Sequence, residues 1–405
     1  MLKNFPLRRN TVLERIFAFV LLTMIFFAVL SAADDINEEI PTSSIFEGIS
    51  ADVIIEDYPK INARSAIVMD FESGRVLFEK NGYIKRPMAS TTKIMTAIIA
   101  LENGNLDDIV KVSKNAASIW GSTIHLTAGE EISLRELMYG LLLCSGNDAA
   151  IAISEHIAGS VEEFLNMMNR KAEEIGAKNT HFTSPHGLDG TGHYSTAYDL
   201  AVITRYALNN PVFNEIIKTK SITMGKRYMA NTNEMLSGYE GADGVKTGYT
   251  GKAGRCLVTS ATKDGRRFIS VVLFCDSRHQ RALSSKMILD YAFANYYNKT
   301  LIKSEYIGTL PVYKGFEKAV PIYVDKSVTM PLTESEYQSL YTRISLPSAV
   351  TAPIKERDFV GTLSVYLNNE ILCESVIRAG KSIKKKNMLQ YLVDVFIVWL
   401  KLMRE

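Results

Sequence analysis

Hydrophobic and polar positions divide the chain into two regions of different texture. From about residue 88 to 209, apolar residues recur at helical spacing, and three helix starts carry N-cap signals at Ser133, Ser160 and Thr196. Strand-like runs lie on both sides of this block, at 63–70, 75–80, 255–262 and 267–274. The last two runs flank an Asp-Gly hairpin turn, and a helix is expected over 284–297. This pattern predicts an antiparallel sheet with helices packed on it, an α/β arrangement.

The second region begins near residue 300, where short β-prone segments alternate with turns. These segments are 306–312, 319–324, 328–332, 341–346, 358–367 and 370–377. They predict a small all-β C-terminal domain, and no catalytic constellation is visible in it. We therefore expect one domain over residues 61–299 and a second over 300–380.

The N-terminus has the pattern of an export signal. Four basic residues precede an apolar run over 16–30, and small residues follow at 31–33. This predicts a signal peptide over residues 1–33, with an uncleaved membrane anchor as the alternative. An acidic, irregular stretch at 34–60 is expected to be a tether. Under both alternatives the rest of the chain lies outside the cytoplasm, and we expect it at the outer face of the bacterial cytoplasmic membrane.

The C-terminus has the pattern of an amphipathic helix. A cluster of lysines at 381–386 precedes residues 388–403, which are apolar apart from Gln390, Asp394 and Lys401. On a helix these three polar residues fall within about 40° of one another, and the segment is short for a membrane span. We predict a helix within 381–405 that lies in the membrane interface, with its lysines against anionic lipid. A short spanning helix and a helix docked on a partner remain as alternatives.

Composition adds two limits to this picture. The chain has 405 residues, is 47% hydrophobic and 22% charged, and has a formal net charge of +2. It can therefore bury a core, and its charge balance gives no reason to expect a nucleic-acid partner. The four cysteines show no C-x-x-C spacing, which argues against a zinc or redox motif. Cys256 and Cys275 fall on strands expected to pair, so a disulfide between them is open.

The candidate chemistry begins at Ser90-Thr91-Thr92-Lys93, at the start of a strongly helical run. Residues three apart share a helix face, so the hydroxyl of Ser90 and the amine of Lys93 are expected to point the same way. A helix N-terminus favours a developing alkoxide, and a lysine in a dry cleft can act as a base. The pair therefore suits a serine acyl-transfer enzyme. Taken alone, the pattern also fits an ordinary helix start with a solvated lysine.

Two later stretches strengthen the case. Ser145-Gly146-Asn147 lies where a helix breaks at the glycine, so the serine can relay a proton and the asparagine amide can bind a carbonyl. Lys246-Thr247-Gly248 comes just before the predicted hairpin, and offers a charge, a hydroxyl and a close backbone approach. Each stretch alone also fits a helix cap or a strand edge.

The three motifs in this order, Ser-x-x-Lys, Ser-x-Asn and Lys-Thr-Gly, resemble the penicillin-recognising serine enzymes. The similarity is close to the low-molecular-mass penicillin-binding proteins that are serine-type D-alanyl-D-alanine carboxypeptidases, and it covers about residues 45 to 380. It extends to the loop at 186–189 with 194–197, and to the whole stretch 246–254. The resemblance implies a β-lactamase-like transpeptidase domain with an antiparallel sheet and a helical subdomain, a small all-β domain and a C-terminal amphipathic helix.

The resemblance also implies roles for individual residues. Lys93 takes the proton of Ser90, which attacks the bond between two D-alanines of a peptidoglycan stem peptide, and β-lactams are trapped at the same ester. The backbone N–H groups of Ser90 and Tyr249 form the oxyanion hole. Ser145, near Lys246, protonates the leaving D-alanine. Thr247 and Arg281 bind the carboxylate of the leaving D-alanine. Asn147 orients the substrate amide, and Gly248 lets the backbone approach the substrate closely.

No cofactor or metal is implied by this reading. The chain departs from many relatives at Tyr249, where they carry histidine, and we expect the change to alter substrate preference more than activity. The alternatives are a β-lactamase, a peptidoglycan endopeptidase, and a non-catalytic wall-binding or β-lactam-sensing protein. A β-lactamase needs a deacylating glutamate that the sequence does not identify. A metallopeptidase built on His181, His186 and His193 fits poorly, because their spacing matches no helix face.

Overall fold

The computed structural model describes residues 58–403 of the chain. The predicted signal (1–33) and most of the predicted tether (34–60) lie outside the described residues. The chain divides into two units between Ala294 and Asn295, and each is described by itself.

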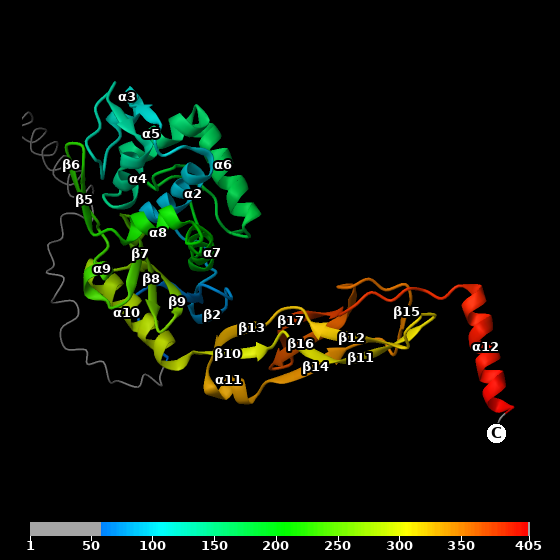
Figure 1. The fold of residues 1–405 in the computed structure, drawn as a ribbon. Coiled ribbons are helices and arrows are strands. Elements are labelled where there is room, and N and C mark those ends of the chain that lie inside the picture. Colours follow the sequence, from blue (N-terminus) through cyan, green and yellow to red (C-terminus); the bar gives the residue numbers. More distant parts are fainter. Residues whose placement is uncertain (1–57, 404–405) are drawn as a thin grey trace, which may run out of the picture. The chain divides into compact units, whose positions relative to one another are not determined.

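The first unit is built on a five-stranded antiparallel sheet (Figure 1). Its strands, in spatial order, are β2 (Val76–Lys80), β1 (Ser65–Asp70), β9 (Arg266–Cys275), β8 (Gly254–Lys263) and β7 (Ala242–Thr250). β8 and β9 are joined by the predicted Asp-Gly hairpin, and β7 is an edge strand. β1, β8 and β9 read as apolar runs because both of their faces are covered by helices.

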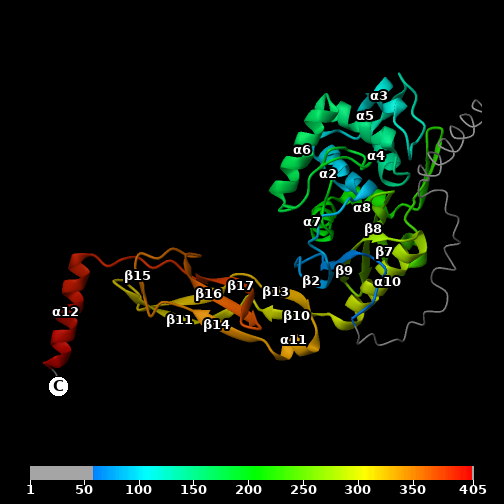
Figure 2. The ribbon, with the colours of Figure 1, turned by 180° about the vertical axis from the view of Figure 1, so that it is seen from behind.

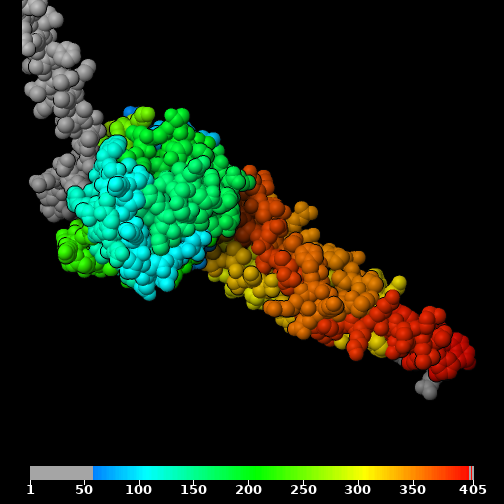
Figure 3. Space-filling view, turned by 90° about the horizontal axis from the view of Figure 1, so that it is seen from above, coloured from blue at the N-terminus to red at the C-terminus, as the bar shows by residue number. Residues whose placement is uncertain are grey.

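The helical layer of the first unit surrounds one buried helix, α2 (Lys93–Asn103). Five more helices complete this layer, namely α4 (Leu134–Leu142), α5 (Asn147–Ala158), α6 (Val161–Glu174), α7 (Ala197–Ala207) and α8 (Pro211–Lys218). The predicted caps are confirmed, because the side chains of Ser133, Ser160 and Thr196 each accept a backbone N–H three residues on. Figure 2 shows the same helices from behind, and Figure 3 shows cyan and green residues of this layer covering one face of the unit.

Shorter elements complete the first unit. They are η3 (Ala89–Thr92), a 3₁₀ turn; α3 (Lys114–Ser118) and α9 (Met235–Gly238); the pair β3 (Ile109–Lys111) and β4 (Glu131–Ser133); and the hairpin β5 (Ser221–Met224) and β6 (Arg227–Ala230).

The last helix of the first unit, α10 (Arg278–Asn295), begins six residues earlier than the sequence predicts. The Ser277 hydroxyl accepts the Gln280 N–H at 3.2 Å and caps the helix there. The missed first turn is polar, so hydropathy does not mark it. The helix packs on the sheet through Ser285, whose hydroxyl contacts those of Ser270 and Thr259 at 2.7 and 3.0 Å.

The second unit is rich in strands, as predicted. A six-stranded sheet has the order β14 (Tyr341–Ser345), β16 (Phe359–Leu367), β17 (Glu370–Ala379), β12 (Ala319–Val324), β11 (Tyr306–Tyr313) and β15 (Val350–Thr351). A second pair joins β10 (Tyr297–Ile302) to β13 (Val328–Leu332), and α11 (Glu334–Gln338) follows. β10 was not predicted, because its polar sequence and its position after α10 hide its strand character. Val320, Val365 and Ile377 lie in the core of this unit.

The chain ends in α12 (Met388–Leu402), close to the predicted bounds. Its large apolar side chains are exposed from Met388 to Leu400, apart from Tyr391, which is half-buried. Two of its polar residues make local contacts, since Gln390 and Asn387 bond reciprocally and Asp394 pairs with Lys386. Among the described residues, no helix combines the length and the hydropathy that a membrane crossing requires.

Candidate active site

Ser90 lies in η3, the 3₁₀ turn that leads into α2, rather than within the α-helix itself. The turn is held by two threonine hydroxyls, since Thr91 donates to the Met88 carbonyl at 2.6 Å and Thr92 to the Ala89 carbonyl at 2.8 Å. Ala89 has a φ of +49°, which an alanine adopts only when its surroundings hold it there. The turn therefore gives Ser90 a fixed position ahead of Lys93.

The ammonium of Lys93 has three oxygen partners and is completely buried. Nζ donates to Ser90 Oγ at 2.9 Å, to Asn147 Oδ1 at 2.8 Å and to the His186 carbonyl at 2.7 Å. A lysine that loses one proton keeps two N–H donors and gains a lone pair. The amide and carbonyl acceptors then retain the two N–H groups, and the lone pair faces the hydroxyl of Ser90. This is the arrangement that a base needs to activate a serine.

The second motif lies between α4 and α5, where Ser145 has a φ of +62° and is almost buried. Gly146 is the N-cap of α5, as the predicted helix break requires. Asn147 begins α5, so its side chain reaches Lys93, and its Nδ2 donates to the Trp120 carbonyl at 2.8 Å. The structure thus brings Ser90 and Lys93, which lie on one segment, together with Asn147, which lies 54 residues further along the chain.

The third motif lies on β7, the edge strand of the sheet. Lys246 and Thr247 are buried, and the Thr247 hydroxyl contacts that of Thr232 at 2.8 Å. A Cβ at Gly248 would lie 3.0 Å from the Ser90 backbone nitrogen and 3.2 Å from the Met88 carbonyl oxygen. Glycine is therefore needed here, because the strand passes directly against η3, the turn that carries Ser90 and that would be the nucleophile turn of the expected reaction. Tyr249 follows Gly248, and the Arg255 guanidinium stacks on its ring at 3.7 Å.

The second and third motifs are linked by the segment that follows β6. The Thr232 N–H donates to the Leu143 carbonyl at 3.1 Å, while the Thr232 hydroxyl contacts Thr247. Burial raises the pKa of the neighbouring Cys144 thiol, and attraction to the Lys246 ammonium opposes this rise. Lys246 therefore lies within electrostatic reach of the chain that carries Ser145.

Arg281, which is expected to bind the substrate carboxylate, is paired with a carboxylate of the protein itself. Its side chain is 0% exposed, with Nε donating to Glu234 Oε1 at 2.9 Å and Nη2 to Oε2 at 3.0 Å. This bidentate pair occupies two of the guanidinium nitrogens, so they are not open to a substrate carboxylate. The sequence could not reveal this, because Glu234 lies 47 residues away from Arg281.

The loop at 186–189 closes the cleft from another side. A Cβ at Gly187 would lie 2.0 Å from the Ala89 carbonyl oxygen, and the residue has a φ of +90°, so the loop presses on the nucleophile turn. Asp189 accepts the Thr250 hydroxyl at 2.7 Å, which joins the loop to the end of β7. The loop therefore supports the nucleophile turn and the third motif together.

The histidines of this region make structural contacts. His193 Nδ1 accepts the Thr183 N–H at 3.1 Å and Nε2 contacts the Thr92 hydroxyl at 2.8 Å, which fixes the proton on Nε2. Burial lowers the pKa of His193 to about 4 and that of His186 to about 3, so both stay neutral at ordinary pH. Among the described residues, no group of three or more His, Cys, Asp or Glu side chains is arranged to hold a metal ion.

The structure also answers the question about the cysteines. Cys256 and Cys275 are not joined by a disulfide, and both are buried. Next to the motifs, a groove of about 1160 Å³ runs between the segment 123–136 and the hairpin β5–β6. Cys144 and Thr232 line the end of this groove that lies nearest the third motif.

Sequence reasoning missed Asp148, the residue after Asn147. Its buried carboxylate accepts the N–H groups of Ile124 and Leu126 at 3.0 Å and that of Ala149 at 2.9 Å. An acidic residue in the first turn of α5 was the available signal, because such residues satisfy backbone donors near helix starts.

Comparisons with known proteins agree with this geometry. Residues 52–277 match the D-alanyl-D-alanine carboxypeptidase family, and residues 296–385 match the C-terminal domain of penicillin-binding protein 5. The chain is 36% identical over 351 residues to the D-alanyl-D-alanine carboxypeptidase DacF of Bacillus subtilis, covering 84% of this chain and 90% of the relative. It is 32% identical over 364 residues to DacA of Escherichia coli K12, covering 86% and 90%.

Solved structures give the same result. Penicillin-binding protein 5 from Haemophilus influenzae superposes with a TM-score of 0.73 at 28% identity, covering 81% of this chain and 99% of that one. DacD from Francisella tularensis superposes with a TM-score of 0.67 at 30% identity, covering 84% and 98%. The chain therefore belongs to the D-alanyl-D-alanine carboxypeptidase family of penicillin-binding proteins.

Proposed function

We propose that Ser90 is the acylated nucleophile of a carboxypeptidase that removes the terminal D-alanine from peptidoglycan stem peptides. The observation that carries this proposal is the buried Lys93 ammonium, which has Ser90 Oγ, Asn147 Oδ1 and a carbonyl as partners within 2.9 Å. The family match supports this activity over those of a β-lactamase, an endopeptidase or a non-catalytic sensor.

In the first step, neutral Lys93 takes the hydroxyl proton of Ser90, and Oγ forms a bond to the carbonyl carbon of the scissile amide. The negative oxygen that develops faces the backbone N–H groups of Ser90 and Tyr249. The close approach of Gly248 to the Ser90 nitrogen supports this pair of donors, because Tyr249 directly follows Gly248 on the strand that passes beside Ser90.

In the second step, the C–N bond breaks and the departing nitrogen of D-alanine takes a proton from the Ser145 hydroxyl. The proton that Lys93 took from Ser90 then passes to Ser145, which restores that hydroxyl and returns Lys93 to its neutral form. The charge of Lys246 favours this transfer by stabilising the serine oxygen. Thr247 binds the carboxylate of the leaving residue, and Asn147 orients the substrate amide. Arg281 supports the site indirectly. Its pair with Glu234 holds the segment that positions Thr232 against Thr247.

Hydrolysis of the ester by water completes the cycle and returns the proton to Ser90. A β-lactam would follow the same first step, but its leaving group stays tethered, so the acyl-enzyme persists. Each step balances with water alone as co-reactant, and the proposal uses no cofactor.

The decisive experiment measures D-alanine release from a pentapeptide that ends in two D-alanines, together with covalent labelling by a fluorescent penicillin. We expect Ser90→Ala to lose both signals and Lys93→Ala to lose nearly all of both. Lys111→Ala, on the exposed strand β3, is the matched control and keeps both. Penicillin labelling of Ser90→Ala at the wild-type rate would refute the assignment.

For the ends of the chain, we propose export by residues 1–33 and peripheral attachment to the outer face of the cytoplasmic membrane through α12. The exposed apolar side chains of α12, such as Phe396 and Trp399, would enter the interface, and lysines 384–386 would meet anionic headgroups. Co-sedimentation with anionic vesicles is expected for the intact chain and lost for Phe396→Glu/Trp399→Glu. Equal sedimentation of that variant would contradict the attachment, and full D-alanine release by it is expected.

A further inference from the structure

The segment 120–127 forms a wall beside the second motif and is fastened to it from the inside. Asn147 donates its Nδ2 to the Trp120 carbonyl at 2.8 Å and its backbone N–H to the Ser122 carbonyl at 2.7 Å. A Cβ at Gly121 would lie 2.7 Å from Asn147 Nδ2, so the wall touches this side chain closely. The orientation of the Asn147 amide, and with it the Lys93 contact at Oδ1, therefore depends on where this wall lies.

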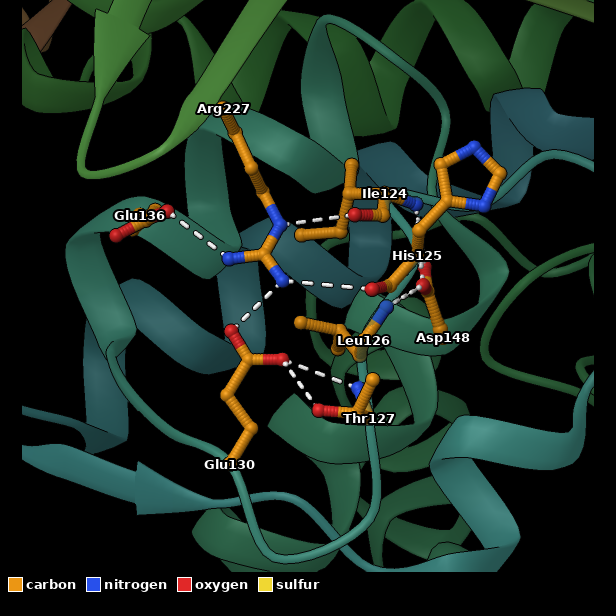
Figure 4. A network of polar contacts seen from close by, with 8 residues as sticks. All are labelled: Ile124, His125, Leu126, Thr127, Glu130, Glu136, Asp148 and Arg227. Atoms are coloured by element: carbon orange, nitrogen blue, oxygen red, sulfur yellow. Dashed lines mark hydrogen bonds and ion pairs between the residues drawn. The ribbon is translucent and has the colours of Figure 1, made fainter.

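Asp148, the next residue, contacts the same wall further along the chain, at Ile124 and Leu126. Both of its oxygens lie 3.0 Å from the Ile124 N–H, and Oδ2 also accepts the Leu126 N–H at 3.0 Å (Figure 4). Between these two anchored residues, His125 has a φ of +58°. A histidine keeps this left-handed conformation only when its neighbours are held, so the wall is under restraint here.

Arg227 fastens the wall from the outside. It comes from β6, and its Nε donates to the Ile124 carbonyl at 2.8 Å, with Nη2 3.4 Å from the His125 carbonyl (Figure 4). Its other guanidinium contacts are to carboxylates, Glu130 at 2.7 Å and Glu136 at 3.4 Å. The pKa of Glu130 is lowered, because hydrogen bonds and the charge of Arg227 outweigh the cost of its burial.

These contacts form a continuous path from the hairpin to the catalytic lysine. Arg227 donates to the Ile124 carbonyl, while Asp148 accepts the Ile124 N–H. Asp148 directly follows Asn147 in the sequence, and Asn147 contacts Lys93. The Arg227 side chain is only 20% exposed, so its ion pairs are partly shielded from water. A planar guanidinium can serve two carboxylates and a carbonyl together, whereas a lysine ammonium cannot match this geometry.

We propose that Arg227 is a positioning residue of the reaction, which acts through the wall 120–127 to hold Asn147 on Lys93. The proposal rests on the roles proposed above for Lys93 and Asn147. Arg227 itself touches neither the nucleophile nor the base. It also lines the groove that leads to Cys144, so the same contacts maintain the shape of the cleft on that side.

The test begins with the full chain and three variants, Arg227→Ala, Arg227→Lys and Lys226→Ala. Lys226 is the matched control, since it precedes Arg227 and lines the same groove but is exposed. We expect Arg227→Ala to lower the rate constant of penicillin acylation roughly 10- to 100-fold, as misplacement by about 1 Å would. Arg227→Lys should lose less, and Lys226→Ala should stay within about twofold of wild type.

The second measurement separates positioning from a merely structural role. In an Asn147→Ala background, the path from Arg227 to Lys93 is cut, so adding Arg227→Ala should change acylation by no more than about twofold. An arginine that only stabilises the fold would lower acylation by the same factor in both backgrounds, and that result would overturn the proposal. All rates are taken at a temperature where thermal unfolding shows each variant folded.

If Arg227→Ala does not fold, Arg227→Gln keeps one donor for the Ile124 carbonyl and takes its place in the same cycle. Loss of the proposed function itself gives a different pattern, because Lys93→Ala would then acylate as wild type does. If Lys93→Ala is inactive but Arg227→Ala acylates at the same rate as Lys226→Ala, the positioning role of Arg227 alone is refuted.

Discussion

Replacement of Glu234 by alanine tests the buried ion pair between Glu234 and Arg281. The change removes both acceptors from Arg281, whose side chain is 0% exposed, and leaves a guanidinium without this counter-charge in the protein interior. Two charge-assisted hydrogen bonds at about 1.5–3 kcal/mol each amount to about 3–6 kcal/mol. Breaking a buried ion pair from one side typically costs about 3–5 kcal/mol, which agrees with this sum.

A loss of about 4 kcal/mol lowers the unfolding midpoint of a domain of this size by about 8–16 °C. The assay is calorimetric thermal unfolding of the purified protein. The transition that belongs to the first unit is identified as the one at which penicillin labelling is lost. Arg135→Ala is the control, because its pair with Asp107 is exposed at 43% and 78% and should be worth less than about 1 kcal/mol.

The double variant Glu234→Leu/Arg281→Met adds information about function. Removing both charges should recover most of the lost stability, because neither charge is then left buried alone. If Arg281 only supports the site, this variant should keep D-alanine release within about tenfold of wild type. Equal midpoints for Glu234→Ala and Arg135→Ala would refute the account of the pair, while a large rise in KM for the folded double variant would restore direct carboxylate binding.

Three further predictions concern the same unit. The pKa of His193 is lowered to about 4 by burial, so the unfolded chain binds a proton there between pH 6.5 and 4 that the folded chain does not; the contribution of His193 to stability is complete above pH 6.5 and falls by on the order of 3 kcal/mol as pH drops through this window, so thermal unfolding of His193→Phe should depend less steeply on pH. A Cβ in Gly248→Ala would lie 3.0 Å from the Ser90 nitrogen, so the backbone must shift and penicillin acylation should drop by about 10²-fold with a lowered midpoint; wild-type acylation would count against the proposed oxyanion hole. Burial raises the pKa of the Cys275 thiol, and Cys256 is equally buried, so both should resist thiol reagents at pH 8 until denaturant is added, whereas rapid labelling of either in the native protein would contradict their burial.

The sequence predicted most elements of this fold because its local signals agree with the tertiary structure. The caps at Ser133 and Ser160 start the helices they indicate, and the Asp-Gly turn after Lys263 joins β8 to β9. Two of the exceptions have a common cause. The first turn of α10 and the strand β10 are polar, so their structure is set by partners elsewhere in the fold rather than by hydropathy.

The candidate site divides in the same way. Ser90 and Lys93 are three residues apart, so helical geometry alone predicts their contact. By contrast, the pairing of Arg281 with Glu234 and the grip of Arg227 on Ile124 join residues 47 and 103 positions apart. Motif spacing carries no information on such contacts, and an arginine read from sequence does not reveal which carboxylate it will meet.

The contacts of Lys93 have a consequence for newly exported chains. Two of its oxygen partners lie 54 and 93 residues away in sequence, so the proposed reactive centre does not exist until distant segments have assembled. A chain still threading across the membrane therefore offers an antibiotic no activated hydroxyl. The fraction of chains that carry covalent penicillin would then measure the fraction that has completed folding.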